Sequence, residues 1–351
     1  MEDVRALRNL ALKKRERHCR PPDAPLGSGG PKGDAVQIGL MIGPERGRYR
    51  DKVAKLVAAA QAAEQAGFAS IWVPQIPDEF DGLTAAALMG DATSRVEIGT
   101  AVMPIQSRHP VAMAQQATST QAVCEGRFTL GVGPSHHWIV TDMLGLPYEK
   151  PARLVRNYLE VMNAALNGPG PVDVDNDHFH VHNPLDVTDI PTSILVAALA
   201  PVMLRVAGEL ASGTILWMAD ERAIGGHIVP RITKAAAAAG RPEPRVVAGI
   251  PVVLCADTEV DEARGWANRL LGHAEYSPNY ERLLEHGNAT DVGDLLAAGD
   301  ESAVIERMRS FRDAGVTDLS LRVLPIGADR DARIASRDRT LAFVSSLCST
   351  F

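Results

Sequence analysis

GRFTLGVGPSHH, residues 126–137, is the stretch of this 351-residue chain that decides its fold. A Gly-Arg turn leads into a short apolar strand, and the strand ends in a loop that carries Ser135, His136 and His137. In parallel α/β folds, catalytic and binding groups gather at the carboxyl ends of the strands. The stretch therefore predicts one strand of such a sheet together with part of its functional rim.

The same alternation of strand and helix recurs eight times between Val36 and Leu324. Each candidate strand is continuously apolar, as in strands that are buried on both faces of a parallel sheet. Several helical segments end at a glycine, namely Gly67, Gly240 and Gly315, as a left-handed C-cap requires. Eight such units favour an α/β fold of the closed (β/α)8 TIM barrel type over an open sheet. The predicted strands are 36–42, 70–73, 96–103, 127–132, 193–198, 213–218, 246–254 and 318–324.

Composition separates an N-terminal extension from the rest of the chain. Residues 1–34 hold a basic run and a stretch rich in Pro and Gly, so we expect a flexible, solvated extension there. Residues 35–351 are expected to form a single barrel domain with an insertion near 168–190. Alternating histidines in this insertion (His178, His180 and His182) predict a solvated β-hairpin. We expect no metal site, because no Cys or paired carboxylate spacing accompanies them.

Charge and cysteine content narrow the class of function. A net charge of −7 argues against nucleic acid or an anionic membrane as the main partner. The four cysteines lie far apart, without the spacing of a zinc site or a disulfide framework, which fits a reducing cytoplasm. No apolar run approaches the roughly 18 residues that span a bilayer, and a signal-peptide core is absent. We expect a cytoplasmic protein that acts on a small-molecule substrate, and a homodimer is an assembly that the sequence allows.

The run RHPVAMAQQATSTQAVCEGRFTLGVG, residues 108–133, resembles the luciferase-like monooxygenase superfamily. The shared features are an Arg-His-Pro after the third strand, a helix, and a Gly-Arg turn into the fourth strand. The resemblance extends from about Val36 to Leu324. The segments GVGPSH and LGLPYEKPARLVRNYLEVM are similar to the branch that uses the deazaflavin coenzyme F-420. The resemblance thus implies a deazaflavin-dependent oxidoreductase that transfers hydride to or from a small organic substrate.

The resemblance also implies where the cofactor binds. A bulge with a non-prolyl cis peptide at the end of the third strand would press on the central ring, and the polar residue after the second strand would lie near the ring. The loop after the fourth strand would contact the ring or the ribityl chain. The loop after the fifth strand would hold the phosphate, and backbone N–H groups at a helix N-terminus favour an anion there. The implied cofactor-binding residues are Gln75, Ala101, Val102, Gly133, Pro134, Ser135, Ala198, Leu199, Ala200 and Pro201.

His136 is the candidate catalytic residue, because it occupies the place of an acid/base glutamate in relatives. Imidazole titrates near neutral pH, so it can donate or accept a proton beside a hydride transfer. The alternative interpretation is a structural loop histidine. Ile76 stands where the sugar-phosphate dehydrogenases of the family carry a catalytic histidine, and this departure counts against sugar-phosphate oxidation.

Flavin mononucleotide (FMN) is the alternative cofactor, and it would make the protein a monooxygenase on the same fold. The bacterial luciferase branch holds the flavin phosphate with an arginine at the position of Pro134. A proline offers neither a charge nor an N–H group, so this residue favours the deazaflavin. A third hypothesis, of another class, is a flavin- or deazaflavin-binding protein without turnover.

Overall fold

The computed structural model describes residues 35–43, 50–168, 170–185, 187–272 and 278–351; the predicted extension at 1–34 lies outside them. Eight parallel strands form the barrel, because β10 pairs with both β9 and β12, and β12 pairs in turn with β1. This closure confirms the predicted (β/α)8 barrel. The barrel strands are β1 (Gln37–Met41), β2 (Ser70–Val73), β3 (Glu97–Thr100), β5 (Phe128–Gly133), β8 (Ser193–Val196), β9 (Gly213–Trp217), β10 (Arg245–Leu254) and β12 (Asp318–Val323).

All eight predicted strands are present, but the one predicted over 96–103 is wrong in its extent. β3 ends at Thr100, and a separate short strand, β4 (Met103–Pro104), resumes the pairing with β5. Between them the peptide bond Ala101–Val102 is cis, as the family resemblance implied. An unbroken apolar run therefore concealed an interruption at the carboxyl end of the barrel.

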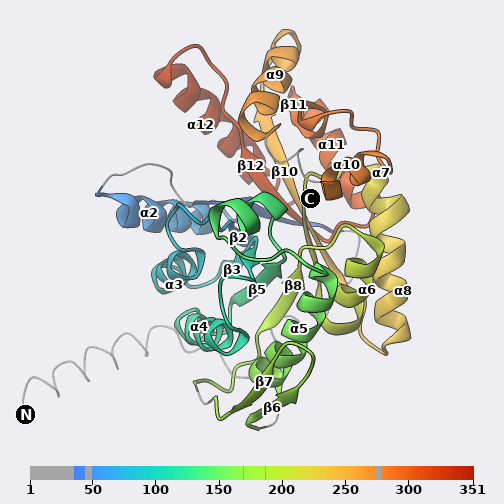
Figure 1. The fold of residues 1–351 in the computed structure, drawn as a ribbon. Coiled ribbons are helices and arrows are strands. Elements are labelled where there is room, and N and C mark those ends of the chain that lie inside the picture. Colours follow the sequence, from blue (N-terminus) through green and yellow to red (C-terminus); the bar gives the residue numbers. More distant parts are fainter. Residues whose placement is uncertain (1–34, 44–49, 169, 186, 273–277) are drawn as a thin grey trace, which may run out of the picture.

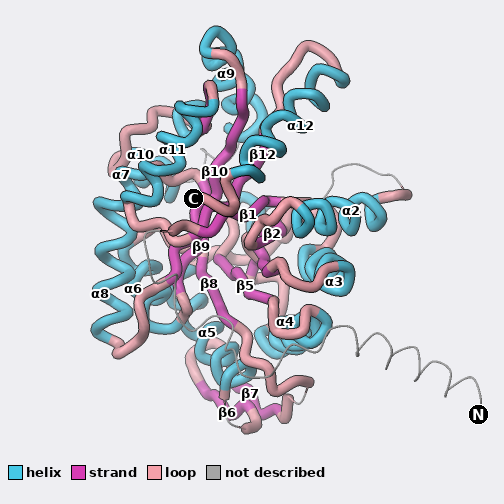
Figure 2. The backbone as a smooth tube through the Cα atoms, turned by 180° about the vertical axis from the view of Figure 1, so that it is seen from behind, coloured by secondary structure: helices cyan, strands magenta, loops and turns pink. Residues whose placement is uncertain are grey.

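Helices cover the outside of the barrel, with α2, α3 and α4 on one flank and α6 and α8 on the opposite flank (Figures 1 and 2). The predicted glycine C-caps at Gly67, Gly240 and Gly315 all have the positive φ angles that such caps require. The outer helices are α2 (Lys52–Gln65), α3 (Gly82–Ala92), α4 (Pro110–Val123), α5 (Pro151–Asn167), α6 (Pro201–Leu210), α8 (Val229–Ala238), α11 (Glu301–Asp313) and α12 (Arg330–Ser346).

The insertion after α5 forms the predicted hairpin, in which β6 (Val172–Asp175) and β7 (His180–Asn183) pair antiparallel. The exposed His180 and His182 face carboxylates of the neighbouring strand, with His182 Nδ1 2.6 Å from the side chain of Asp173. The hairpin lies beside α5 and leads into the amino end of β8 (Figure 1). Its turn reaches the N-terminal turns of α4 and α5, where the His109 ring contacts Phe179 and Arg153 bonds to Asp177.

A larger insertion, between β10 and β12, is absent from the sequence-based prediction. It contains short helices and the strand β11, which extends the sheet by pairing with the carboxyl half of β10. A second apolar cluster joins this insertion to the barrel. In it, the buried residues of the insertion pack against Met218, Cys255 and Leu324, which directly follow β9, β10 and β12. Its elements are η3 (Asp257–Glu259), α9 (Val260–Leu271), α10 (Pro278–Leu284), η5 (Val292–Leu295) and β11 (Ala297–Gly299).

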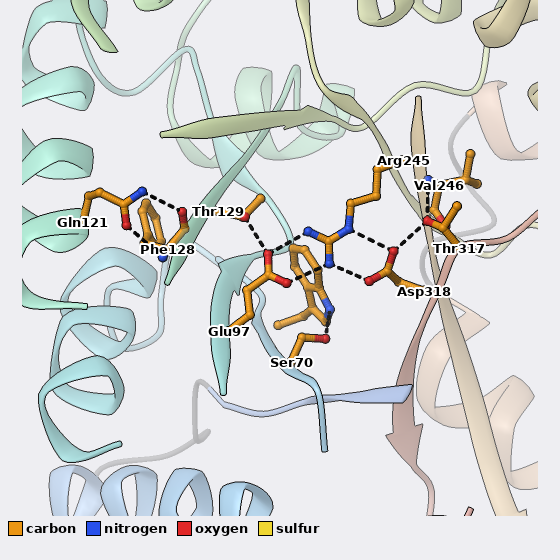
Figure 3. Close-up of polar contacts among 10 residues, drawn as sticks. Ser70, Glu97, Gln121, Phe128, Thr129, Arg245, Val246, Thr317 and Asp318 are labelled. Atoms are coloured by element: carbon orange, nitrogen blue, oxygen red, sulfur yellow. Dashed lines mark hydrogen bonds and ion pairs between the residues drawn. The ribbon is translucent and has the colours of Figure 1, made fainter. Parts of the chain in front are cut away.

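An ion-pair network crosses the amino end of the barrel (Figure 3). Arg245, the first residue of β10, donates to Glu97 of β3 at 2.7 and 2.8 Å and to Asp318 of β12 at 2.5 and 2.9 Å. Its guanidinium carbon lies 5.4 Å from the centre of the buried Trp72 ring. Thr129 of β5 also donates to Glu97. The network links four strands inside the barrel, so the opposite, carboxyl end is the one available for a ligand.

Candidate cofactor and active site

Gly133, the last residue of β5, lies close to two neighbouring segments of the chain. A Cβ atom at this position would lie 2.9 Å from both the Val102 side chain and the Cβ of Ala197. Val102 and Ala101 in turn pack against the buried residues that fill the barrel, among them Trp72. The predicted ring-binding residues of the segment between β3 and β4 and of β5 therefore meet in a tightly packed, apolar floor at the carboxyl end of the barrel.

The loop after Gly133 is fixed through its backbone carbonyls. Gln106 Nε2 donates to the Pro134 carbonyl at 2.6 Å, and the Tyr148 hydroxyl donates to the Ser135 carbonyl at 3.3 Å. Ser135 itself has a φ of 57°, in the left-handed region. Neither Gln106 nor Tyr148 was identified from the sequence, although a polar residue just after a strand end was a signal for Gln106. With its backbone held, the loop can present the side chains of Ser135 and His136 in a fixed direction.

His136 is half-buried and lies between two aromatic rings. Its imidazole stacks on Tyr280 of α10 at a centroid distance of 5.7 Å and on Trp138 at 6.0 Å. Burial lowers the pKa of His136 below its usual 6.5 and so favours the neutral form of the ring. Burial also raises the pKa of Tyr280. The neutral imidazole has one N–H donor and one acceptor nitrogen, as an acid/base group requires.

Gln75, at the end of β2, uses its amide to shape its own loop. Its Oε1 accepts the N–H of Gly82 at 2.6 Å, and its Nε2 donates to the Ile76 carbonyl at 3.1 Å. One further donor and one further acceptor site of this amide remain. The side chain thus orders the turn that leads into α3.

The arginine of the Arg-His-Pro motif has a structural partner. Arg108 forms an ion pair with Asp81, which also caps α3 by accepting from the Thr84 N–H. The hydroxyl of Tyr158 donates to the Arg108 carbonyl at 3.1 Å. Burial opposes ionisation of Asp81, but the bonds from Thr84 and Arg108 lower its pKa below the usual range. Arg108 therefore joins the loops after β2 and β4.

The loop after β8 leads into α6, whose N-terminus has no side-chain cap. Ala200 is the N-cap residue of α6 and Pro201 is in the first turn. Ala198 is buried, whereas Leu199 and Ala200 are half-buried. Within the part of the chain that the structure describes, the N–H groups of Ala200, Val202 and Met203 donate no hydrogen bond. Three free donors at the positive end of a helix dipole form a place for an anion.

The His136 loop and the α6 N-terminus are neighbours, because β5 and β8 pair in parallel. In that pairing Val132 is opposite Val196. His136 follows Val132 by four residues, and Ala200 follows Val196 by four residues. A group that can transfer a proton therefore lies on the loop next to a group of donors suited to a phosphate.

A family model described as luciferase-like monooxygenase matches residues 36–318. The chain belongs to this family. The luciferase-like chain is 23% identical over 344 residues to 5,10-methylenetetrahydromethanopterin reductase of Methanopyrus kandleri, which covers 85% of this chain and 95% of the reductase. The match confirms the family that was inferred from residues 108–133.

Solved structures share the luciferase-like barrel. An F-420-dependent secondary alcohol dehydrogenase in complex with an F-420–acetone adduct gives a TM-score of 0.70 at 20% identity, over 88% of this chain and 99% of that chain. The oxygenating constituent of 3,6-diketocamphane monooxygenase from Pseudomonas putida, in complex with FMN, gives 0.66 at 17% identity, over 89% and 97%. At these identities the likeness establishes the fold, on which both cofactors occur.

Proposed function

We propose that this luciferase-like protein is a coenzyme F-420-dependent oxidoreductase that transfers hydride to or from a small organic substrate. The observation that carries the proposal is the half-buried His136 on the loop adjoining the free N–H groups of the α6 N-terminus. Two relatives support it by their names, since one is a reductase and the other is an F-420-dependent alcohol dehydrogenase.

The residues of the rim fit the parts of this cofactor. The N–H groups of Ala200, Val202 and Met203 would hold the phosphate, and the apolar floor at Val102 and Gly133 would support the ring. When bound, the deazaflavin supplies a ring that carries hydride in two-electron steps. FMN is less well supported, because Pro134 cannot supply the arginine contact to a flavin phosphate.

His136 would serve as the proton donor or acceptor for the substrate. A hydride transfer to or from a carbonyl or alcohol carbon requires a matching proton at the oxygen. The imidazole meets this need because burial lowers its pKa and favours the neutral form, which can both donate and accept a proton. Tyr280 and Trp138 would hold the ring in place and limit the access of water.

The cofactor assignment is tested by titrating the purified protein with F-420 and, separately, with FMN while cofactor fluorescence is followed. Tight binding of F-420 with weak binding of FMN is the expected result. A preference for FMN would replace the proposal with a flavin-dependent monooxygenase. Binding of neither would overturn both assignments.

Catalysis is tested with His136→Ala after a substrate screen with F-420. The variant should bind the cofactor as the native protein does and should lose about 100-fold or more in kcat, which is the usual contribution of a positioned acid/base. Unchanged turnover would remove His136 from the mechanism. Cofactor binding with no turnover of any alcohol, ketone or alkene tested would favour the binding protein without catalysis.

A cytoplasmic location and a homodimer belong to the same proposal. Cys124 and Cys255 are buried and unpaired, which fits a reducing compartment. None of the described helices has the length and apolar character to cross a bilayer. Sedimentation velocity of the purified protein would test the dimer.

A further inference from the structure

His227 is a buried residue that hydrogen-bonds to the loop that leads into α6. It lies in the short helical turn η2 (Ile224–Ile228), is 4% exposed, and places Nε2 2.8 Å from the Leu199 carbonyl. A carbonyl oxygen can only accept, so Nε2 carries the hydrogen. The other ring nitrogen, Nδ1, is buried without a partner among the described residues. The ring is therefore the neutral tautomer that donates to Leu199.

The bond from His227 sets the orientation of a peptide group. In a trans peptide the C=O and the following N–H point in opposite directions. The Leu199–Ala200 peptide is trans, and its carbonyl points to the buried imidazole. The Ala200 N–H is consequently directed away from His227, and, like the N–H groups of Val202 and Met203, it donates to no acceptor among the described residues.

We propose that His227 is a positioning residue that aligns the α6 N-terminus for the phosphate of the bound cofactor. It touches the loop and not the ligand, so it acts through the Leu199–Ala200 peptide. The inference rests on the proposed use of F-420. His227 lies between β9 and α8, whereas the loop that it supports lies in the preceding strand–helix unit, between β8 and α6.

His227 is itself held from both sides. His286 stacks on it with ring centroids 4.0 Å apart and planes inclined by 15°, and Arg231 donates to its carbonyl at 2.9 Å. The chain after His286 is tied down as well, because the N–H groups of Asn288 and Ala289 both bond to the buried Asp220. The insertion between β10 and β12 thus contacts the rim at two places. Tyr280 of α10 stacks on His136, and His286 stacks on His227.

The test compares two ligands that differ in the phosphate. F-420 and the phosphate-free deazaflavin, which keeps the ring and the ribityl chain, are titrated into the native protein, His227→Ala, His227→Gln and the control His182→Ala. His182 is an exposed histidine of the hairpin, and its ring bonds to Asp173. His182→Ala therefore also removes a bonded imidazole, but at a position outside the rim. Thermal unfolding of each variant is recorded alongside binding.

His227→Ala is expected to weaken F-420 binding about tenfold, as the loss of one well-placed hydrogen bond does. It should leave binding of the phosphate-free deazaflavin unchanged. His227→Gln should bind F-420 nearly as the native protein does, because its amide can donate to the same carbonyl, and His182→Ala should bind both ligands normally.

Two results would overturn the inference while leaving the proposed function intact. One is native F-420 affinity in His227→Ala, and the other is an equal loss for both ligands with a lower melting temperature, which indicates a general structural role. Failure of the native protein to bind F-420 would instead refute the proposed function, and the inference with it.

Discussion

The imidazole of His136 stacks on the phenol ring of Tyr280, with ring centroids 5.7 Å apart and planes inclined by 25°. The two residues come from distant parts of the chain, one from the loop after β5 and the other from α10 in the insertion between β10 and β12. Tyr280 packs against the main core and also against the apolar cluster of the insertion. The insertion therefore determines the environment of the candidate catalytic group.

Removing the Tyr280 ring should raise the pKa of His136. Burial is the cause of its lowered pKa, so Tyr280→Ala should move the value back toward 6.5 by admitting water. An NMR titration of the His136 ring protons measures this change. Tyr280→Phe is the matched control, since it keeps the ring and should keep the low pKa. An unaltered pKa in Tyr280→Ala would show that other groups bury the imidazole.

Stability should fall as the pH drops below about 6.5. The pKa values of His136 and His227 are both lowered by burial, so the folded state binds fewer protons than the unfolded state. Their contribution is complete above the unfolded pKa and is lost as the pH falls through the folded pKa. Melting temperatures between pH 8 and pH 5 measure the effect, and His136→Gln should make the decline shallower. An equally steep decline in that variant would assign the effect to other groups.

Arg245→Met should destabilise the barrel by about 3–5 kcal/mol. The substitution leaves the carboxylates of Glu97 and Asp318 facing each other inside the barrel without their shared cation. Urea unfolding gives the free energy directly. The triple variant Arg245→Met, Glu97→Gln, Asp318→Asn is the control and should recover most of the loss, because it removes the unpaired charges. A single variant as stable as the native protein would contradict the assignment of a structural network.

Gly133→Ala should cost about 1–3 kcal/mol of stability and weaken binding of the deazaflavin ring. The added Cβ would lie 2.9 Å from both Val102 and Ala197, so the floor of the site must shift. Gly170→Ala is the control, since nothing lies within 4 Å of a Cβ there, and it should change the stability by less than about 0.5 kcal/mol. Urea unfolding and ligand titration together separate the two effects. Full affinity in a destabilised Gly133→Ala would show that the floor does not contact the ring.

The kinds of element and their order along the chain follow from local signals in the sequence. Eight apolar runs became eight barrel strands, and glycines such as Gly67 and Gly315 marked helix ends, because these signals depend on a residue and its near neighbours. The same local rules indicated a helix soon after Pro201, and α6 begins at that residue. The resemblance to the family added what local physics does not contain, namely the cis bond after Ala101 and the place of the candidate acid/base at His136.

Which of these residues are in contact depends on the packing of the whole barrel. His136 stacks on Tyr280, and Arg245 bonds to a carboxylate 148 residues away, because closure of the barrel brings distant strands together. His227 and its carbonyl partner Leu199 likewise become neighbours only when successive strand–helix units pack side by side. Such contacts leave no periodic trace in the chain, since a polar residue in a loop has the same local signature whether it faces solvent or a buried carbonyl.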